Sequence, residues 1–324
     1  MSDRSALLQA ILRHDLASFL AKSFGTLEPG SPYLDNWHVH AIAHQLMRVH
    51  RGEVKRLVIN VPPRSGKSIL VTVGFTAWLL GHDPRKRVMA ISYANELARK
   101  HAADFRSVVG TEWYRRLFPA FQVKTDREME LITTGHGFRY AGSIGGSVLG
   151  RGANLIVVDD PIKGLAAALS ASERRRVAEF YDNTLYSRLN NKAQDAIIIV
   201  MQRLHQDDLV GHVLDKEPWE VLSIPAIAPE DLTYRIGPLP HEVYRRRAGE
   251  VLHPEREPPE ALEAIRRNLG TLNFSAQYQQ DPQPAEGHAI KRDWIRSYDA
   301  VPDTFDLKIV SWDTASTVTD AADW

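Results

Sequence analysis

The segment Val61-Pro62-Pro63-Arg64-Ser65-Gly66-Lys67-Ser68 carries the residue types that bind phosphate groups. A glycine in a tight turn lets backbone amides approach phosphate oxygens, and a helix that begins there adds positive potential. Lys67 can place a charge on β- and γ-phosphates, and the Ser68 hydroxyl can ligate Mg²⁺. A strand-like run before the segment and a helical pattern after it complete this context. We predict a site for ATP with Mg²⁺ at residues 63–68; an ordinary loop is the alternative.

A second candidate is the apolar run Leu155-Ile156-Val157-Val158, which ends in Asp159 and Asp160. The run is typical of a buried strand, and ligands of parallel sheets bind at the carboxyl ends of the strands. We expect Asp159 to hold Mg²⁺, directly or through water, and Asp160 to orient or deprotonate the attacking water. Many such runs are plain strand ends, so hydrolysis is favoured only because the phosphate loop is also present.

Two further segments could serve the same site. Arg151 closes a glycine-rich stretch, Gly142–Gly152, from which it could reach phosphate or the nucleotide of a neighbouring subunit. A flexible surface loop is the alternative. Gln202 begins the polar segment 202–208, which follows an apolar run and could sense the γ-phosphate. A solvated strand end is equally consistent with that pattern.

Other motifs are weaker evidence for a functional site. Arg174-Arg175-Arg176 and Arg245-Arg246-Arg247 are short basic runs, and solvated faces are a commoner origin than DNA contact. The pair His40 and His44 has zinc-ligand spacing, but no third ligand accompanies it, so a metal site is disfavoured. We expect Tyr278-Gln279-Gln280 to serve packing.

Apolar spacing predicts the elements that must position these residues. We expect strands at 56–61, 87–92, 155–158 and 196–201. Helices are expected at 5–22, 37–49, 68–80, 96–109 and 173–189. Because strands alternate with helices, the sequence predicts an α/β fold whose central sheet is mainly parallel and flanked by helices.

The composition of the chain limits which classes of protein and of binding site are possible. Lys+Arg and Asp+Glu number 40 each, so any contact with nucleic acid has to be local rather than the result of net charge. The chain contains no cysteine, which excludes disulfides and thiolate metal sites. No signal peptide and no apolar run long enough to span a bilayer are recognisable, which favours a soluble cytoplasmic protein.

The chain changes character beyond Asp215, where prolines become frequent and strand-like runs disappear. We predict a nucleotide-binding core at 1–215 and a small lid or linker subdomain at 216–290. Leu307–Val310 then restarts a strand close to the last residue, Trp324. We expect 291–324 to be the start of a further domain that is cut short.

Taken in order, the motifs resemble those of the large subunit of tailed-phage terminases. The resemblance rests on the phosphate loop and on Ile91–Ala94, Gly150–Pro161, Gln202–Leu209 and Gln277–Pro282, and it runs from about residue 30 to the end. Val61 stands where the first glycine of the loop is usual, which this family tolerates. Asp160 stands where many relatives have glutamate, so its water would lie closer to the backbone.

The resemblance implies a P-loop NTPase fold of the ASCE type, joined to an RNase H-like nuclease. It implies a motor that forms a ring on a portal protein, works with a small terminase subunit and moves double-stranded DNA into a procapsid in the bacterial host cytoplasm, without becoming part of the virion. It assigns Arg64 to phosphate, with Arg64 or Arg151 as the arginine finger. Adenine would bind near Tyr33, Trp37, His38 and Gln45.

The nuclease part of the resemblance is short. Ser311–Ala315 is similar to the first nuclease strand, so Asp313 matches its first metal-binding acid, and Asp323 is a second match. A Mg²⁺ or Mn²⁺ site at Asp313 would need the missing acids. Our hypothesis is therefore an ATPase motor subunit without nuclease activity. The alternatives are a competent metal-dependent nuclease and a non-catalytic prophage remnant that only binds nucleotide.

Overall fold

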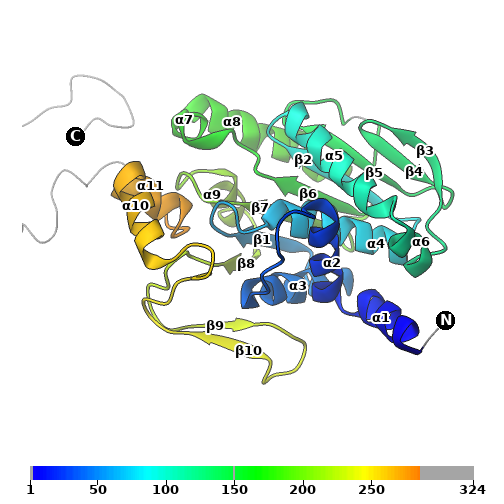
Figure 1. Ribbon diagram of the computed structural model, residues 1–324. Helices are drawn as coiled ribbons and strands as arrows, with labels where there is room; N and C mark the ends of the chain where they lie inside the picture. The colour runs from blue at the N-terminus through cyan, green and yellow to red at the C-terminus, as the bar shows by residue number, and fades with distance from the viewer. Residues whose placement is uncertain (1–2, 149, 285–324) are drawn as a thin grey trace, which may run out of the picture. The chain divides into compact units, whose positions relative to one another are not determined.

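An eight-stranded sheet forms the centre of the computed structural model, which describes residues 3–148 and 150–284 (Figure 1). Its strand order is β3-β4-β5-β2-β6-β7-β1-β8. All neighbours from β5 to β8 in this order are parallel, and the pairs β3–β4 and β4–β5 are antiparallel. The predicted α/β fold with a mainly parallel sheet is confirmed. The strands are β1 (Arg56–Asn60), β2 (Arg87–Ser92), β3 (Val123–Arg127), β4 (Glu130–Thr133), β5 (Phe138–Ser143), β6 (Leu155–Asp159), β7 (Ala196–Met201) and β8 (Glu220–Ser223).

The four predicted strands are β1, β2, β6 and β7, which form the middle of the sheet. The bounds predicted for β2 and β7 are confirmed, and those of β1 and β6 differ by one residue. Every residue of β1, β6 and β7 is buried, as expected for parallel strands covered on both faces. Their side chains alternate between the faces: in β7, Ile198 and Val200 join one core cluster, while Ile197 and Ile199 join the other.

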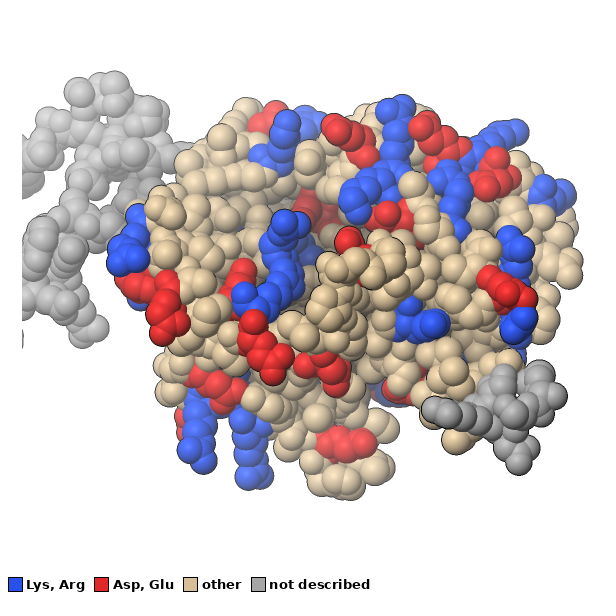
Figure 2. Space-filling view, viewed as in Figure 1, with Lys and Arg blue, Asp and Glu red and all other residues tan. Residues whose placement is uncertain are grey.

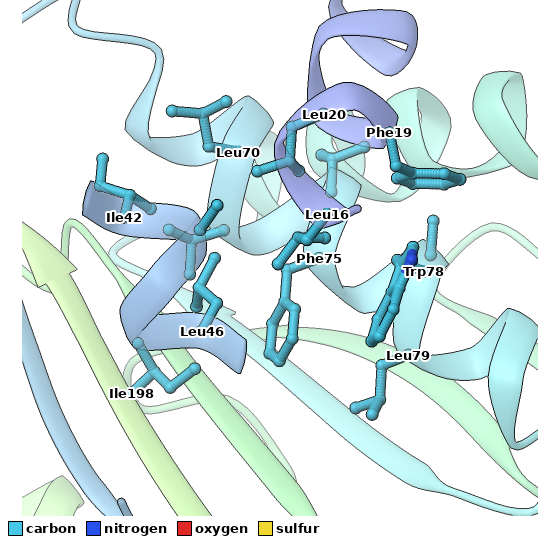
Figure 3. Close-up of a cluster of buried hydrophobic side chains, with 14 of the residues drawn as sticks. Leu16, Phe19, Leu20, Ile42, Leu46, Leu70, Phe75, Trp78, Leu79 and Ile198 are labelled. Atoms are coloured by element: carbon cyan, nitrogen blue, oxygen red, sulfur yellow. The ribbon is translucent and has the colours of Figure 1, made fainter. Parts of the chain in front are cut away.

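Helices cover both faces of this sheet (Figure 1). The larger core cluster lies under α2 (Leu16–Leu27), α3 (Trp37–His50), α4 (Thr76–His82), α5 (Asn95–Val109) and α6 (Glu112–Leu117). Figure 3 shows part of it, where Phe75 lies between Leu46 and Trp78. The second cluster involves α7 (Gly164–Leu169), α8 (Ala171–Phe180) and α9 (Leu209–Leu214). Burying each large side chain contributes roughly 1.5–3 kcal/mol, so this packing holds the strand ends in place.

The helix predicted at 5–22 is wrong as a single element. The chain instead forms α1 (Asp3–His14) and α2, separated at Asp15. Asp15 has extended backbone angles, and its carboxylate accepts a hydrogen bond of 2.9 Å from the amide of Ser18. An N-cap of this kind starts a new helix, and it outweighed the continuous apolar spacing.

Two predicted helices contain irregular turns. The helix predicted at 68–80 consists of a π-helical stretch, η1 (Ser68–Phe75), followed by α4. The helix predicted at 173–189 is α8, then a π turn, η2 (Tyr181–Leu185), and a short 3₁₀ turn, η3 (Tyr186–Arg188). π-Helical turns are rare and often lie at functional sites. That of η1 begins at the last residue of the phosphate loop.

The expectation that strands disappear beyond Asp215 is wrong. Besides β8, this part contains a two-stranded antiparallel hairpin of β9 (Leu232–Arg235) and β10 (Val243–Arg246), followed by α10 (Pro259–Leu269) and α11 (Thr271–Gln277). Each of these strands has four residues, too few for periodicity to show. Tertiary partners stabilise them: β8 pairs with β1, and the hairpin packs against α3.

Residues up to Pro282 form one compact unit. The boundaries expected at 215 and 290 stay predictions, and the strand and the acids expected beyond residue 290 lie outside the described residues. None of the described helices is both long enough and apolar enough to cross a membrane.

Candidate nucleotide-binding site

The phosphate loop leaves the sheet at the end of β1. Val61 and Pro62 are buried, and Pro63 follows them into a turn in which Arg64 and Gly66 have φ values of 64° and 74°. Glycine adopts this left-handed region without strain, whereas it is uncommon for arginine. The loop ends where η1 begins.

Lys67 reaches from this loop to the end of β6. Its Nζ lies 3.0 Å from Oδ2 of Asp160, and both side chains are largely buried. Asp160 has a φ of 44°, a left-handed conformation stabilised by hydrogen bonds of its amide to Val200 O (3.0 Å) and of the Tyr93 amide to its carbonyl (3.2 Å). Burial raises the pKa of the Asp160 carboxyl group, and the ammonium of Lys67 opposes that rise.

Asp159, the preceding residue, faces a different set of partners. The Ser68 hydroxyl donates to its Oδ1 at 3.1 Å, and the Thr72 hydroxyl donates to its Oδ2 at 2.6 Å. The side chain is fully buried, which raises its pKa, while the charge of Lys67 and these two hydrogen bonds lower it. Nδ1 of His101 lies 3.6 Å from Oδ2.

The predicted magnesium ligands Ser68 and Asp159 are therefore side by side. A hydroxyl and a carboxylate oxygen are hard donors of the kind that Mg²⁺ prefers. Their separation of 3.1 Å, at the carboxyl edge of the sheet, suits two ligands of one cation. The donor set fits the ion that accompanies ATP.

Two buried basic residues near Asp159 were not foreseen. Burial lowers the pKa of His101 to about 4 and that of Arg139 to about 9. The Arg139 guanidinium donates to Thr72 O at 3.4 Å and lies 4.9 Å from the ring centre of Phe105. Arg139 belongs to β5, which was not predicted as a strand, so no local signal pointed to it.

A cavity of about 720 Å³ opens beside the loop. Three parts of the chain line it: the segment around Tyr33 and His38, the loop residues Arg64–Gly66, and His253, Arg256 and Glu257. Tyr33 and His38 were predicted to lie near the adenine. The third group was missed, because it lies in a turn more than two hundred residues from Tyr33 and carries no motif.

Two arginines, Arg64 and Arg256, and two glutamates, Glu28 and Glu257, line this cavity. The guanidinium groups of Arg64 and Arg256 make no hydrogen bond or ion pair with any residue that the structure describes. Burial lowers the pKa of His38 to about 4, so this side chain is neutral at pH 7, and its Nε2 lies 3.3 Å from Ser65 O. The guanidinium groups of Arg64 and Arg256 are therefore the groups in this cavity that can bind an anion.

Trp37 and Gln45, which were predicted near the adenine, have partners outside this cavity. Trp37 stacks on Tyr244 of the hairpin with ring centres 4.6 Å apart and planes 4° apart. Gln45 accepts a 2.8 Å hydrogen bond from Arg48 and lies next to Glu220 of β8. Neither lines the cavity beside the loop. Neighbouring residues of α3 point to different parts of the molecule: Trp37 contacts the hairpin, whereas His38 contacts the phosphate loop.

Gln202 follows β7 at the carboxyl edge of the sheet, whereas Arg151 precedes β6. The backbone N–H of Gln202 helps to lower the pKa of the Asp160 carboxyl group, and the Oε1 atom of Gln202 is buried without a partner among the described residues. Arg151 donates to Glu130 at 3.0 Å and lies 4.4 Å from the ring centre of Tyr140. Asp313, the predicted nuclease ligand, lies outside the described residues.

The glutamines near residue 280 have a packing role, as predicted. Oε1 of Gln280 accepts a 3.0 Å hydrogen bond from the amide of Arg203, directly after Gln202. Oε1 of Gln279 accepts one of 2.9 Å from the amide of Ile227. The segment therefore joins the end of β7 to the chain beyond β8.

Comparison with known proteins finds no matching family model and no matching curated protein. Solved structures with this fold include a mutant ATPase domain of the large terminase of Thermus phage P74-26. It shares 16% identity over 80% of this chain and 98% of its own length, with a TM-score of 0.50. The bacteriophage HK97 large terminase shares 14% identity over 83% of this chain but 55% of its own, with a TM-score of 0.51. The described part of this chain therefore has the fold of the ATPase domain of phage large terminases.

Proposed function

We propose that this chain is the ATP-hydrolysing subunit of a phage or prophage DNA-packaging motor. The observation that carries the proposal is the paired arrangement at one sheet edge, where Lys67 meets Asp160 and Ser68 meets Asp159. The likeness of the fold to large terminase ATPase domains supports it. An ordinary loop would not bring a lysine, a hydroxyl and two buried carboxylates together beside an arginine-lined cavity.

The reaction follows from these positions. The phosphates of ATP lie against the loop amides and Arg64, and the γ-phosphate competes with Asp160 for Lys67. Asp160 then accepts a proton from water as the water oxygen attacks the γ-phosphorus. The bond between that phosphorus and the β,γ-bridging oxygen breaks, and ADP and phosphate leave. A carboxylate with a pKa raised by burial is a stronger base than one in water.

The magnesium ion of the substrate would be held by Ser68 and Asp159, where it neutralises charge on the β- and γ-phosphates. Thr72 orients the Asp159 carboxylate through its second oxygen. We infer that Gln202, whose buried Oε1 has no partner among the described residues, responds to the γ-phosphate.

The motor context belongs to the same proposal. We infer that the chain acts in a ring on a portal protein, with a small terminase subunit, on double-stranded phage DNA in the host cytoplasm. The chain covers 55% of the length of the HK97 large terminase, so packaging activity is proposed and not read from that likeness. Either Arg64, in the cavity, or Arg151, from a neighbouring subunit, supplies the arginine finger.

Replacing Lys67 by alanine tests the proposal. The ammonium group is the charge that pairs with both Asp160 and phosphate, so its loss should lower DNA-stimulated ATP hydrolysis by about 10²- to 10³-fold. The measurement is phosphate release with double-stranded DNA and Mg²⁺. Lys124→Ala, at an exposed position in β3, is the matched control and should leave the rate unchanged.

Equal rates for Lys67→Ala and the unaltered chain would refute the assignment. Tight ATP binding by the unaltered chain without turnover, even with DNA and portal present, would instead favour a protein that only binds nucleotide.

A further inference from the structure

The β9–β10 hairpin presents two chemically different faces (Figure 1). Leu232 pairs with Arg246, and Tyr234 pairs with Tyr244, so these four side chains share one face. The opposite face carries Arg235 and Arg245, and Arg247 extends it directly after β10. We refer to Arg235, Arg245 and Arg247 as the basic face.

The other face of the hairpin is fixed to the rest of the fold. Trp37 stacks on Tyr244, and the Tyr234 hydroxyl donates to Ser223 O at 3.1 Å. The buried guanidinium of Arg246 donates to three carbonyls, those of Pro225, Ala226 and Glu250. Arg246 therefore has a structural role, although it belongs to the same basic run as Arg245 and Arg247.

The carboxylates of this region are engaged by other groups. Asp231 accepts a 2.8 Å hydrogen bond from the amide of Ala248, and Glu242 accepts one of 2.7 Å from the amide of Leu239. Glu250 accepts from the Tyr244 hydroxyl and from the backbone amide of Arg247. These acids stabilise the turns that flank the two strands.

The arginines of the basic face have no such partners. All three are exposed, and none of their guanidinium groups makes a hydrogen bond or ion pair with the described residues. Arg235 and Arg245 are diagonal neighbours across the hairpin, where Cα atoms lie about 7–8 Å apart. Figure 2 shows basic side chains projecting at the lower edge, where Figure 1 places the hairpin. A patch of unpaired like charges on an anchored ribbon is complementary to a row of anions.

We propose that the basic face binds the phosphate backbone of double-stranded DNA. Guanidinium groups match phosphate oxygens with paired hydrogen bonds, and a two-stranded ribbon is narrow enough to follow the major groove. Because the chain has equal numbers of acidic and basic residues, DNA must be held by a local surface of this kind. The inference rests on the proposed packaging function and names its DNA-contacting element.

The same anchoring links this surface to the nucleotide. Trp37 holds the hairpin, and the next residue, His38, lies 3.3 Å from Ser65 O in the phosphate loop. A shift of the loop on hydrolysis is therefore transmitted through the start of α3 to the hairpin and the DNA on it. The residue that holds the hairpin, Trp37, thus directly precedes the residue that contacts the phosphate loop, His38.

The test is a variant with Arg235→Gln, Arg245→Gln and Arg247→Gln together. Its affinity for a short double-stranded DNA is measured by fluorescence anisotropy at several salt concentrations, without nucleotide. Loss of up to three phosphate contacts should weaken binding and reduce the slope of log K against log[salt] by about 2–3. Basal ATP hydrolysis should be unchanged, while its stimulation by DNA should fall.

The matched control is Arg85→Gln, Arg99→Gln and Arg116→Gln, which removes the same charge from arginines that are paired with acids. An equal loss of affinity in both variants would overturn the proposal, and so would an unchanged salt slope in the hairpin variant. Loss of self-association with intact DNA binding would overturn it in favour of a protein partner. DNA binding is measured without nucleotide, so it is independent of ATP hydrolysis. If the unaltered chain bound DNA through these arginines but hydrolysed no ATP, the proposed function would be refuted and the DNA-binding proposal would stand.

Discussion

Asp159 and Asp160 are adjacent carboxylates with different partners, because their backbone conformations differ. Asp159 ends β6 in regular strand pairing and points to Ser68 and Thr72. Asp160 takes a φ of 44°, which turns its side chain to Lys67. A left-handed backbone conformation at a residue other than glycine costs of order 1–3 kcal/mol, and at Asp160 two backbone hydrogen bonds stabilise it.

At this scale, His101 should make stability depend on pH. Its folded-state pKa of about 4 is below the unfolded value of 6.5, so the folded chain binds fewer protons than the unfolded chain between these values. The contribution of neutral His101 to the free energy of unfolding is therefore fully present above pH 6.5. It is lost as the pH falls toward 4, and the total loss is about 3 kcal/mol. Urea unfolding of His101→Gln at pH 7, 5.5 and 4.5 should show a flatter pH dependence than the unaltered chain.

His241→Gln is the comparison, since His241 is exposed in the fold. The buried His38 shifts in the same direction, so part of the dependence remains in the His101 variant. Parallel stability curves for His101→Gln and the unaltered chain would contradict the prediction.

At the scale of elements, α3 joins the hairpin to the phosphate loop through its first two residues. Asn36 caps the helix by accepting from the amide of His38, and its own amide group donates to Leu252 O, 216 residues away. Trp37 and His38 then diverge, one to the hairpin and the other to the loop. The first turn of α3 therefore contacts both the hairpin and the phosphate loop.

Trp37→Leu should separate these roles. Because Trp37 stacks on Tyr244 and does not line the cavity beside the loop, the Kd for ATP should stay within about threefold, while the free energy of unfolding falls by about 1–2 kcal/mol. Isothermal titration and urea unfolding measure the two quantities.

Tyr33→Leu provides the contrast, since Tyr33 lines that cavity and its replacement should weaken ATP binding. If Trp37→Leu weakened ATP binding as much as Tyr33→Leu does, Trp37 would have to be assigned to the nucleotide-binding site, as the resemblance implied.

At the scale of the whole molecule, the cavity exists only because three distant segments meet. The first follows α2, the second is the phosphate loop, and the third is the turn of His253, Arg256 and Glu257 before α10. Because the third segment lies beside the first two, Arg256, which lies beyond β8, lines the same cavity as the phosphate loop.

Arg256→Ala should raise the Kd for ATP about tenfold, because a guanidinium–phosphate contact at a partly exposed site is worth about 1.4 kcal/mol. Fluorescent ATP titration measures the change. Arg267→Ala removes the same charge from an exposed position on α10 outside the cavity and should have no effect. Equal affinities in the two variants would remove Arg256 from the site.

The sequence by itself determined the central strands, the phosphate loop and the two acids. These features are local: β6 and β7 are runs buried on both faces, so their hydrophobicity alone marks them, and the turn at Gly66 needs glycine wherever it occurs. The parallel arrangement then brings Lys67, Ser68 and both acids to one edge, because strands that run in the same direction end on the same side.

Only the tertiary structure decided what lies around that edge. The break at Asp15, the short strands beyond β7 and the roles of Trp37, Arg139 and Arg256 all depend on partners far away in the chain. The basic run at Arg245–Arg247 shows the reason most clearly. Strand alternation buries Arg246 against carbonyl groups and leaves its two neighbours in solvent, and which face is buried depends on what packs there.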